Sequence, residues 1–379
     1  MIYLDNAATT LVKPSRVISA VQRAMQTMAS PGRGAHRPAM LAAETLYDCR
    51  AEAAELFRVP EPEQVVFTMN ATHALNLAIH SLAKPGMPVV TSGFEHNSVI
   101  RPLRSLGAEL RVAGRRLFDP TDTLERFERL LPGAGLAVCT HVSNAFGYIL
   151  PIDEIAALCR SRGVPLIVDA SQSAGTLPVD FGALGAAFIA MPGHKGLYGP
   201  QGTGLLLCAE PGRPLMQGGS GADSRFPLMP EYLPDRLEAG THNVCGIAGL
   251  LEGLRYVREK GVSAILAHER GLLALAEQGL GQLGLRLYTG KAQSGVLSFE
   301  APGMDCEELA GVLSEEGLCL RAGLHCAPLA HESAGTLERG TLRMSFSAFT
   351  APEEVRAACS QIKETLSRLG NRGRTREKE

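Results

Sequence analysis

The chain has 379 residues, of which 45% are hydrophobic and 20% charged, and a formal net charge of −2. A chain this long exceeds the size at which one hydrophobic core stops growing, so two domains are expected. The balanced charge gives no indication of a nucleic-acid or membrane-surface partner. No apolar run approaches the length of a membrane span, and the N-terminus MIYLDNAATT lacks the pattern of a secretion signal. We therefore expect a cytoplasmic protein.

The cysteines fit a reducing compartment. There are nine of them, an odd number at irregular spacing, and none forms a CxxC pair. Neither a disulfide framework nor a structural metal site is expected from such a pattern. Several, such as Cys139 and Cys208, sit in apolar runs and are typical of small core residues.

The first two thirds of the chain alternates between helical periodicity and short apolar runs. Helices are predicted over residues 14–28, 39–57, 72–83, 98–106, 122–131 and 152–162. Strands are predicted over residues 64–68, 88–92, 109–113, 136–143, 165–170, 186–191 and 204–208. Such alternation predicts a mostly parallel sheet between layers of helices, with ligands at the carboxyl ends of its strands.

The pattern changes after residue 260. Helices are predicted over residues 263–283, 305–316 and from 352 onward, and strands over 295–300, 319–322 and 341–347. The polar residues 371–379 are expected to form a frayed tail. Residues 218–238, rich in Gly, Pro and charge, are expected to form a surface loop near the site or a subunit interface. We expect a large domain over 14–258 and a small α+β domain from 1–13 with 259–379.

Two charged side chains follow neighbouring strands of the expected sheet. Asp169 ends the apolar run PLIVD, and Lys195 follows the run AAFIAM inside the segment MPGHKG. Taken alone, Asp169 could be a helix N-cap and Lys195 an exposed loop lysine. Taken together they suit pyridoxal 5′-phosphate (PLP), which needs a lysine for its aldehyde and a carboxylate to protonate its ring nitrogen. Gln172 could then reach the ring oxygen, and His194 could donate to the phosphate.

Three further turns carry candidate residues. Ala71 and Thr72 begin a helix after a strand, which is an arrangement that binds phosphate through backbone N–H groups and a hydroxyl. His96 also follows a strand and could stack on an aromatic ring and move protons. Asn144 could hydrogen-bond the ring oxygen or a substrate carboxylate. The simpler alternatives, an N-cap at the first site and a capping or core histidine at the second, stay open.

These residues, with the N-terminal LDNAATT and the segment RAGLHCAP at 321–328, resemble the class V aminotransferase family of PLP enzymes, fold type I. Within it the chain is similar to the cysteine desulfurases of the second group, whose signature is RxGxHCA. The resemblance covers nearly the whole chain. It implies that the enzyme converts L-cysteine to L-alanine and transfers the sulfur to Cys326 as a persulfide.

The resemblance also implies a role for each matching position. Lys195 corresponds to the Schiff-base lysine, Asp169 to the partner of the pyridine nitrogen, Gln172 to the ligand of the ring hydroxyl, and His96 to the stacking acid–base histidine. Thr72 and His194 correspond to phosphate ligands, and Thr241 to a residue that reaches the phosphate of a partner subunit, which implies a homodimer. Asn144, Arg321 and Arg343 correspond to substrate-binding positions, with Arg343 clamping the substrate carboxylate. A sulfur-acceptor protein is a further expected partner.

Alternatives remain within and outside the fold. A selenocysteine lyase, a cysteine sulfinate desulfinase or a C–S lyase would share the PLP residues, and a non-catalytic PLP-fold binding partner would be expected to lose Lys195 or Asp169. The chain also departs from the family pattern. Pro192 stands where many relatives have a serine, Asn70-Ala71 replaces Gly-Thr, and Gly196 is an extra residue after the lysine.

Overall fold

A seven-stranded sheet forms the centre of the molecule, for which a computed structural model describes residues 1–32, 34–221 and 225–376. Its order is β2-β8-β7-β6-β5-β3-β4. The strands are β2 (Val65–Thr68), β3 (Pro88–Ser92), β4 (Glu109–Ala113), β5 (Leu136–Thr140), β6 (Leu166–Asp169), β7 (Phe188–Pro192) and β8 (Gly204–Cys208). Strand β8 runs antiparallel to its neighbours β2 and β7, and all other pairs are parallel. The mostly parallel sheet is confirmed.

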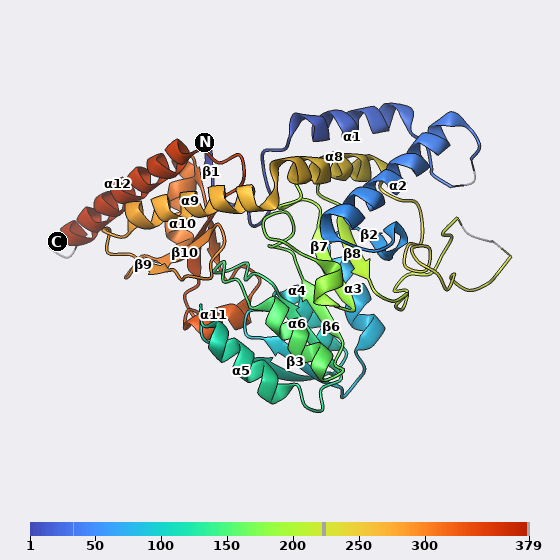
Figure 1. Ribbon diagram of the computed structural model, residues 1–379. Coiled ribbons are helices and arrows are strands. Elements are labelled where there is room, and N and C mark those ends of the chain that lie inside the picture. Colours follow the sequence, from blue (N-terminus) through green and yellow to red (C-terminus); the bar gives the residue numbers. More distant parts are fainter. Residues whose placement is uncertain (33, 222–224, 377–379) are drawn as a thin grey trace.

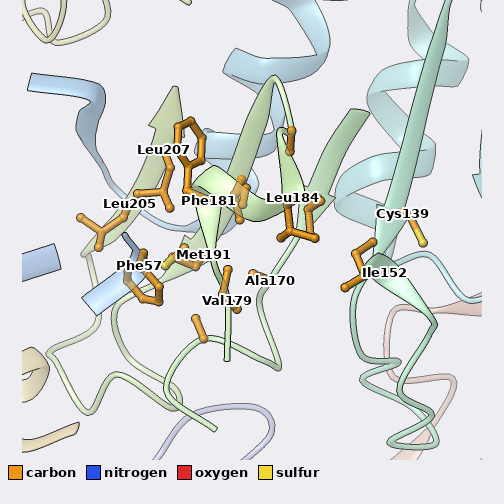
Figure 2. Packing of buried hydrophobic residues seen from close by; sticks show 14 of the residues in the cluster. Phe57, Cys139, Ile152, Ala170, Val179, Phe181, Leu184, Met191, Leu205 and Leu207 are labelled. Carbon is orange, nitrogen blue, oxygen red and sulfur yellow. The ribbon is translucent and has the colours of Figure 1, made fainter. Parts of the chain in front are cut away.

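Helices cover both faces of this sheet, because alternate strand side chains point to opposite sides. In β2, Val65 and Phe67 join one apolar cluster and Val66 joins another. The first cluster includes side chains of α2 (Arg37–Phe57), α5 (Pro120–Leu130), α6 (Ile152–Ser161) and α8 (Val244–Lys260). The second includes side chains of α3 (Ala71–Leu82) and α4 (Asn97–Ser105). Figure 2 shows part of the first cluster, including Phe181 and the β8 residues Leu205 and Leu207.

Helix α8 was not predicted. Its sequence VCGIAGLLEGLRYVREK is apolar around most of its circumference and contains glycines, which lower helix propensity. The glycines serve close packing: a Cβ at Gly253 would lie 2.2 Å from the carbonyl oxygen of Leu197. Helix α1 (Ser15–Thr27) lies alongside α8 (Figure 1). The short helices α7 (Phe181–Leu184) and α11 (Pro328–Ala334) were also missed.

A second sheet forms from the C-terminal third. Its order is β12-β13-β10-β9, and every pair is antiparallel. The strands are β9 (Arg286–Tyr288), β10 (Val296–Glu300), β12 (Arg321–Gly323) and β13 (Thr341–Ser345), and the helices are α9 (Val262–Leu280), α10 (Cys306–Glu315) and α12 (Pro352–Arg376). These elements share an apolar cluster of their own, which Leu4 joins. The division at residues 13 and 258 stays a prediction that this separate cluster supports.

The strand expected over 319–322 is two strands. β11 (Leu318–Cys319) pairs in parallel with β1 (Ile2–Tyr3), whereas β12 pairs with β13, because the chain changes partner at Leu320. A single apolar run does not reveal such a change of sheet. Strands β1 and β11 form a two-stranded sheet of their own, and the next residue joins the second sheet, where Ser345 N donates to Leu4 O at 2.7 Å. The following residues reach the Lys195 loop, where Thr10 N donates to His194 O at 3.1 Å.

Two other expectations concern chain segments. Helix α12 continues to Arg376, so the frayed tail is wrong for 371–376, while 377–379 lie outside the described residues. Three of the residues 371–376 are arginines, which are good helix formers, and a helix that has already begun is extended far more easily than a new one is started. Residues 218–221 and 225–238 contain neither helix nor strand, as expected of a loop. None of the described helices is both long and apolar enough to cross a membrane.

Candidate active site

Five turns at one edge of the large sheet line a pocket of about 200 Å³. They follow β2, β3, β5, β6 and β7, whose carboxyl ends share that edge because β2 and β7 are both antiparallel to β8. The predicted residues in its wall are Ala71, Thr72, His96, Asn144, Asp169, Gln172, His194 and Lys195. Sheet topology thus brings together residues that span more than a hundred positions of sequence.

Lys195 lies two residues after Gly193, in a tight turn. A Cβ at Gly193 would lie 2.1 Å from Thr203 Oγ1, and one at Gly196 would lie 2.4 Å from Ala174 O, so both positions exclude a side chain. The extra residue Gly196 therefore fits by close backbone packing. Burial lowers the pKa of the Lys195 amine to about 8, although Asp169 opposes the shift. Among residues 1–32, 34–221 and 225–376, none hydrogen-bonds its amine.

Asp169 and Gln172 lie on the turn after β6. Asp169 is 3% exposed, and its Oδ1 accepts from Ser171 N at 2.9 Å. The Gln172 amide donates to Ala7 O at 3.0 Å, which fixes this side chain against the N-terminal segment. The carboxylate is thus held rigidly in the pocket wall beside the lysine turn.

The N-terminus of α3 faces the same pocket. Asn70 is its N-cap, with Oδ1 accepting from His73 N at 2.9 Å, so Thr72 is free of that task. Nearby, His194 has a pKa lowered to about 4 by burial and by the charges of Lys195 and Lys13. Its Nδ1 is buried, and no partner is found for it among the described residues. A neutral imidazole and the N–H groups of the helix N-terminus that Asn70 does not cap together suit an anion.

His96 is a helix cap, as one interpretation of the sequence had it, and it also faces the pocket. It is the N-cap of α4, where its Nδ1 accepts from Ser98 N at 3.0 Å, and it also lines the pocket. Burial lowers the pKa of His96. A ring that caps a helix on one edge is held in one orientation, which is what a stacking group requires.

Cys326 lies on an exposed loop that is joined to the pocket wall. Its carbonyl oxygen accepts from Asn97 N at 2.8 Å, next to His96, and Asn144 Nδ2 donates to His325 O at 2.6 Å. His325 and Cys326 have φ of 50° and 56°, a left-handed turn that presents the thiol outward. All nine cysteines lie in the described residues, and Cys326 alone among them is exposed.

The remaining predicted residues do not line the pocket. Arg343 is 1% exposed and donates to Asp5 Oδ1 at 2.7 Å and to Asn144 O at 2.8 Å, while its Nε is buried without a partner among the described residues. Arg321 is exposed and donates to Asp5 Oδ2 at 3.0 Å. Both arginines therefore converge on one carboxylate beside the pocket.

Thr241 lies on a different surface, at a cavity next to the segment 238–243. That segment is fixed by Glu238, whose carboxylate accepts from Arg50, from His242 and from the backbone N–H of Phe67. The Glu238–Arg50 ion pair is buried on both sides. Thr241 is thus exposed on a rigid support and is not among the residues that line the pocket around Lys195.

Sequence reasoning missed four groups around the site. Asp5 was quoted in a motif without a role, and Lys13, whose pKa burial lowers to about 8, donates to His194 O at 3.0 Å. Glu95 is fully buried, and burial raises its pKa to about 8. Ser98 lines the pocket between Thr72 and His96. Only Ser98 gave a local signal, a hydroxyl in the first turn of a helix that begins at a strand end.

Known proteins share both the sequence and the fold. The family described as "Aminotransferase class-V" matches residues 2–357. A probable cysteine desulfurase of Mycolicibacterium paratuberculosis is 35% identical over 94% of this chain, which spans 54% of that longer protein. One of Pyrococcus abyssi is 32% identical over 97% of this chain and 95% of its own length.

Solved structures of cysteine desulfurases have the same fold as this chain. The apo cysteine desulfurase of Thermococcus onnurineus has a TM-score of 0.88 and 31% identity, covering 97% of this chain and 94% of that one. A cysteine desulfurase of Escherichia coli has a TM-score of 0.85 at 26% identity, covering 96% and 94%. This likeness confirms the fold expected from the sequence, PLP fold type I. The chain belongs to the class V aminotransferase family.

Proposed function

We propose that this protein is a PLP-dependent cysteine desulfurase that converts L-cysteine to L-alanine and takes the sulfur onto Cys326 as a persulfide. The observation that carries the proposal is that the loop of Cys326 is hydrogen-bonded to the wall of the pocket. The backbone of Cys326 is bonded to the residue after His96, and Asn144 of the pocket wall is bonded to the preceding residue of the loop. The relatives named cysteine desulfurase support the same reaction.

The residues of the pocket fit PLP. Class V aminotransferases use this cofactor, which supplies an electron sink for charge that develops on the substrate α-carbon. An amine of lowered pKa, a buried carboxylate and a helix N-terminus with a hydroxyl are the groups its aldehyde, ring nitrogen and phosphate require. The unpartnered Nδ1 of His194 is a further position for a phosphate oxygen. Because Ala71 and Pro192 lack the hydroxyls that many relatives have there, the phosphate would be held by the N-terminus of α3, the Thr72 hydroxyl and His194.

Each side chain then has a task. Lys195 would hold the aldehyde and, as a free amine, would take the proton from the substrate α-carbon. Asp169 keeps a proton on the ring nitrogen, and Gln172 binds the ring hydroxyl. His96 would stack on the ring and accept a proton, because burial lowers its pKa and so favours the neutral imidazole.

Arg343 and Arg321 are proposed to bind the substrate carboxylate with Asn144. The planar fork of an arginine suits a carboxylate, and Asp5 supplies the carboxylate that both side chains contact in the structure. A substrate carboxylate that enters would share or replace Asp5 as their partner. Asp5 thus keeps a buried guanidinium compensated before substrate binds.

Cys326 completes the reaction. Its sulfur forms a bond to the substrate sulfur while the carbon–sulfur bond of the substrate breaks. The electron pair of the broken bond stays on the carbon, which then takes a proton and leaves in alanine. The exposed position of Cys326 suits delivery of the persulfide sulfur to an acceptor protein.

The protein is further proposed to be a cytoplasmic homodimer. Thr241 lies outside this chain's pocket on a fixed segment, as needed for a residue that reaches the phosphate of a partner subunit. Side chains that are exposed in the single chain, including Met216, Phe226 and Leu228, lie on the segment that precedes it.

The test compares Cys326→Ala with Cys245→Ala, a partly exposed cysteine elsewhere. With L-cysteine as substrate, Cys326→Ala should abolish alanine formation and keep the cofactor absorbance, whereas Cys245→Ala should behave as the wild type. Full activity of Cys326→Ala would refute the role of the thiol. Selenocysteine, assayed in parallel, separates a lyase that does not need this thiol from a desulfurase that does.

A further inference from the structure

Ser98 joins two parts of the pocket that the proposed function treats separately. Its hydroxyl lies 2.8 Å from Thr72 Oγ1, at the N-terminus of α3, and 2.9 Å from His96 Nδ1, at the N-terminus of α4. Ser98 is 9% exposed and lines the pocket. A hydroxyl in this place connects the anion site to the acid–base histidine through two hydrogen bonds.

The backbone of Ser98 determines which nitrogen of His96 carries the proton. Ser98 N lies 3.0 Å from Nδ1, and a backbone N–H can only donate, so Nδ1 must accept. Burial lowers the pKa of His96, as do the charges of Lys195, Arg101 and Arg343, against the opposing charge of Asp169. The ring is therefore neutral near pH 7 and has its proton on Nε2.

The hydroxyls of Thr72 and Ser98 can donate one hydrogen bond each. When an anion is bound, three acceptors compete for them: the anion, Thr72 Oγ1 and His96 Nδ1. Without an anion, Thr72 can donate to Ser98, and Ser98 can donate to His96 Nδ1. When an anion accepts from Thr72, the Thr72 oxygen becomes the acceptor for Ser98, and His96 Nδ1 keeps the backbone N–H as its donor. An anion at Thr72 thus removes one of the two donors that share the Nδ1 lone pair.

We propose that Ser98 is a positioning residue that fixes His96 as its Nε2–H tautomer and couples the histidine ring to the anion bound at Thr72. The inference rests on the proposed function for the identity of that anion, the phosphate of PLP. The backbone N–H of Ser98 supplies the tautomer, and its hydroxyl supplies the coupling. Phosphate binding then leaves Nδ1 a better base, so the proton-carrying ring is adjusted only after the cofactor is in place.

The two contributions separate in the variant Ser98→Ala, which keeps the N–H and removes the hydroxyl. The measurement is nitrogen NMR of full-length protein labelled at histidine, with His96→Gln to identify the signals. In the wild type, Nδ1 should be unprotonated and Nε2 protonated, and inorganic phosphate should move the Nδ1 signal along its own binding curve. In Ser98→Ala the tautomer should stay and the phosphate response of Nδ1 should disappear.

The Ser98 hydroxyl contributes one neutral hydrogen bond, which limits how much its removal can change phosphate binding. Ser98→Ala should change the affinity for inorganic phosphate by no more than about tenfold, and Ser98→Thr, which keeps the hydroxyl, should restore the response of Nδ1. A proton on Nδ1 in the wild type would overturn the inference. So would an Nδ1 signal that phosphate does not move, or one that moves equally in Ser98→Ala.

A separate measurement distinguishes failure of the cofactor assignment. Borohydride reduction of the loaded protein followed by peptide mass spectrometry should place the cofactor on Lys195. If it does not, the proposed function fails while the tautomer and its phosphate response are still decided by NMR. If it does and the NMR result is negative, only the role of Ser98 is refuted.

Discussion

The lowered pKa of Lys195 predicts an amine that is unusually reactive at neutral pH. Burial lowers this pKa to about 8, and the neutral form is the nucleophile. At pH 7 roughly one amine in ten is then neutral, compared with about one in 2,500 for an ordinary lysine near pKa 10.4. The difference amounts to an enrichment of about 200-fold.

The assay is competitive acylation of the cofactor-free protein with a trace of acetic anhydride between pH 6 and 11. Peptide mass spectrometry compares Lys195 with a free lysine peptide in the same tube. Labelling of Lys195 should rise about tenfold for each pH unit below 8 and become constant near pH 9, whereas the peptide should level off about two units higher. Since Asp169 raises the pKa of Lys195, Asp169→Asn should move the plateau to lower pH. A Lys195 curve that parallels the peptide would refute the reasoning.

Two stability predictions use urea denaturation. Asp5→Asn leaves the buried Arg343 guanidinium without its carboxylate and should lower the free energy of unfolding by about 3 kcal/mol, whereas Arg321→Ala, which removes only the exposed partner, should cost at most about 1 kcal/mol. Equal effects would contradict this assignment of the buried charge. Gly196→Ala should cost about 1–3 kcal/mol, because its methyl group would meet a backbone carbonyl at 2.4 Å, and Gly271→Ala, with nothing within 4 Å, should be neutral or slightly stabilising. A neutral Gly196→Ala would mean that the lysine turn is not closely packed.

The sequence predicted the large sheet because buried parallel strands carry short apolar runs and amphipathic helices lie between them. Because ligands collect at the carboxyl edge of such a sheet, the sequence also predicted that Asp169, Lys195 and His96 lie together, and all three line one pocket. Helix α8 was missed because it is buried over most of its circumference, so its apolar residues do not stand out at a clear helical period. The split of the strand at Leu320 escaped because partner choice depends on the N-terminal strand, more than 300 residues away.

Contacts between side chains that are far apart in the sequence could not be predicted either. Asp5 as the shared partner of Arg321 and Arg343 depends on the β1–β11 pairing and on the register of β13, which no local pattern encodes. The link from Thr72 through Ser98 to His96 likewise requires two helices to begin side by side. Residue type at a strand end was thus readable from the sequence, whereas the contacts that tune each group were not.

The central claim is tested most directly by locating the transferred sulfur. The protein is given L-cysteine, the products are trapped by alkylation, and each cysteine peptide is examined by mass spectrometry. We predict one additional sulfur on Cys326, formed together with alanine, and none on partly exposed Cys245 or Cys319. Alanine formed with the sulfur on another residue, or with none on the protein, would contradict the account.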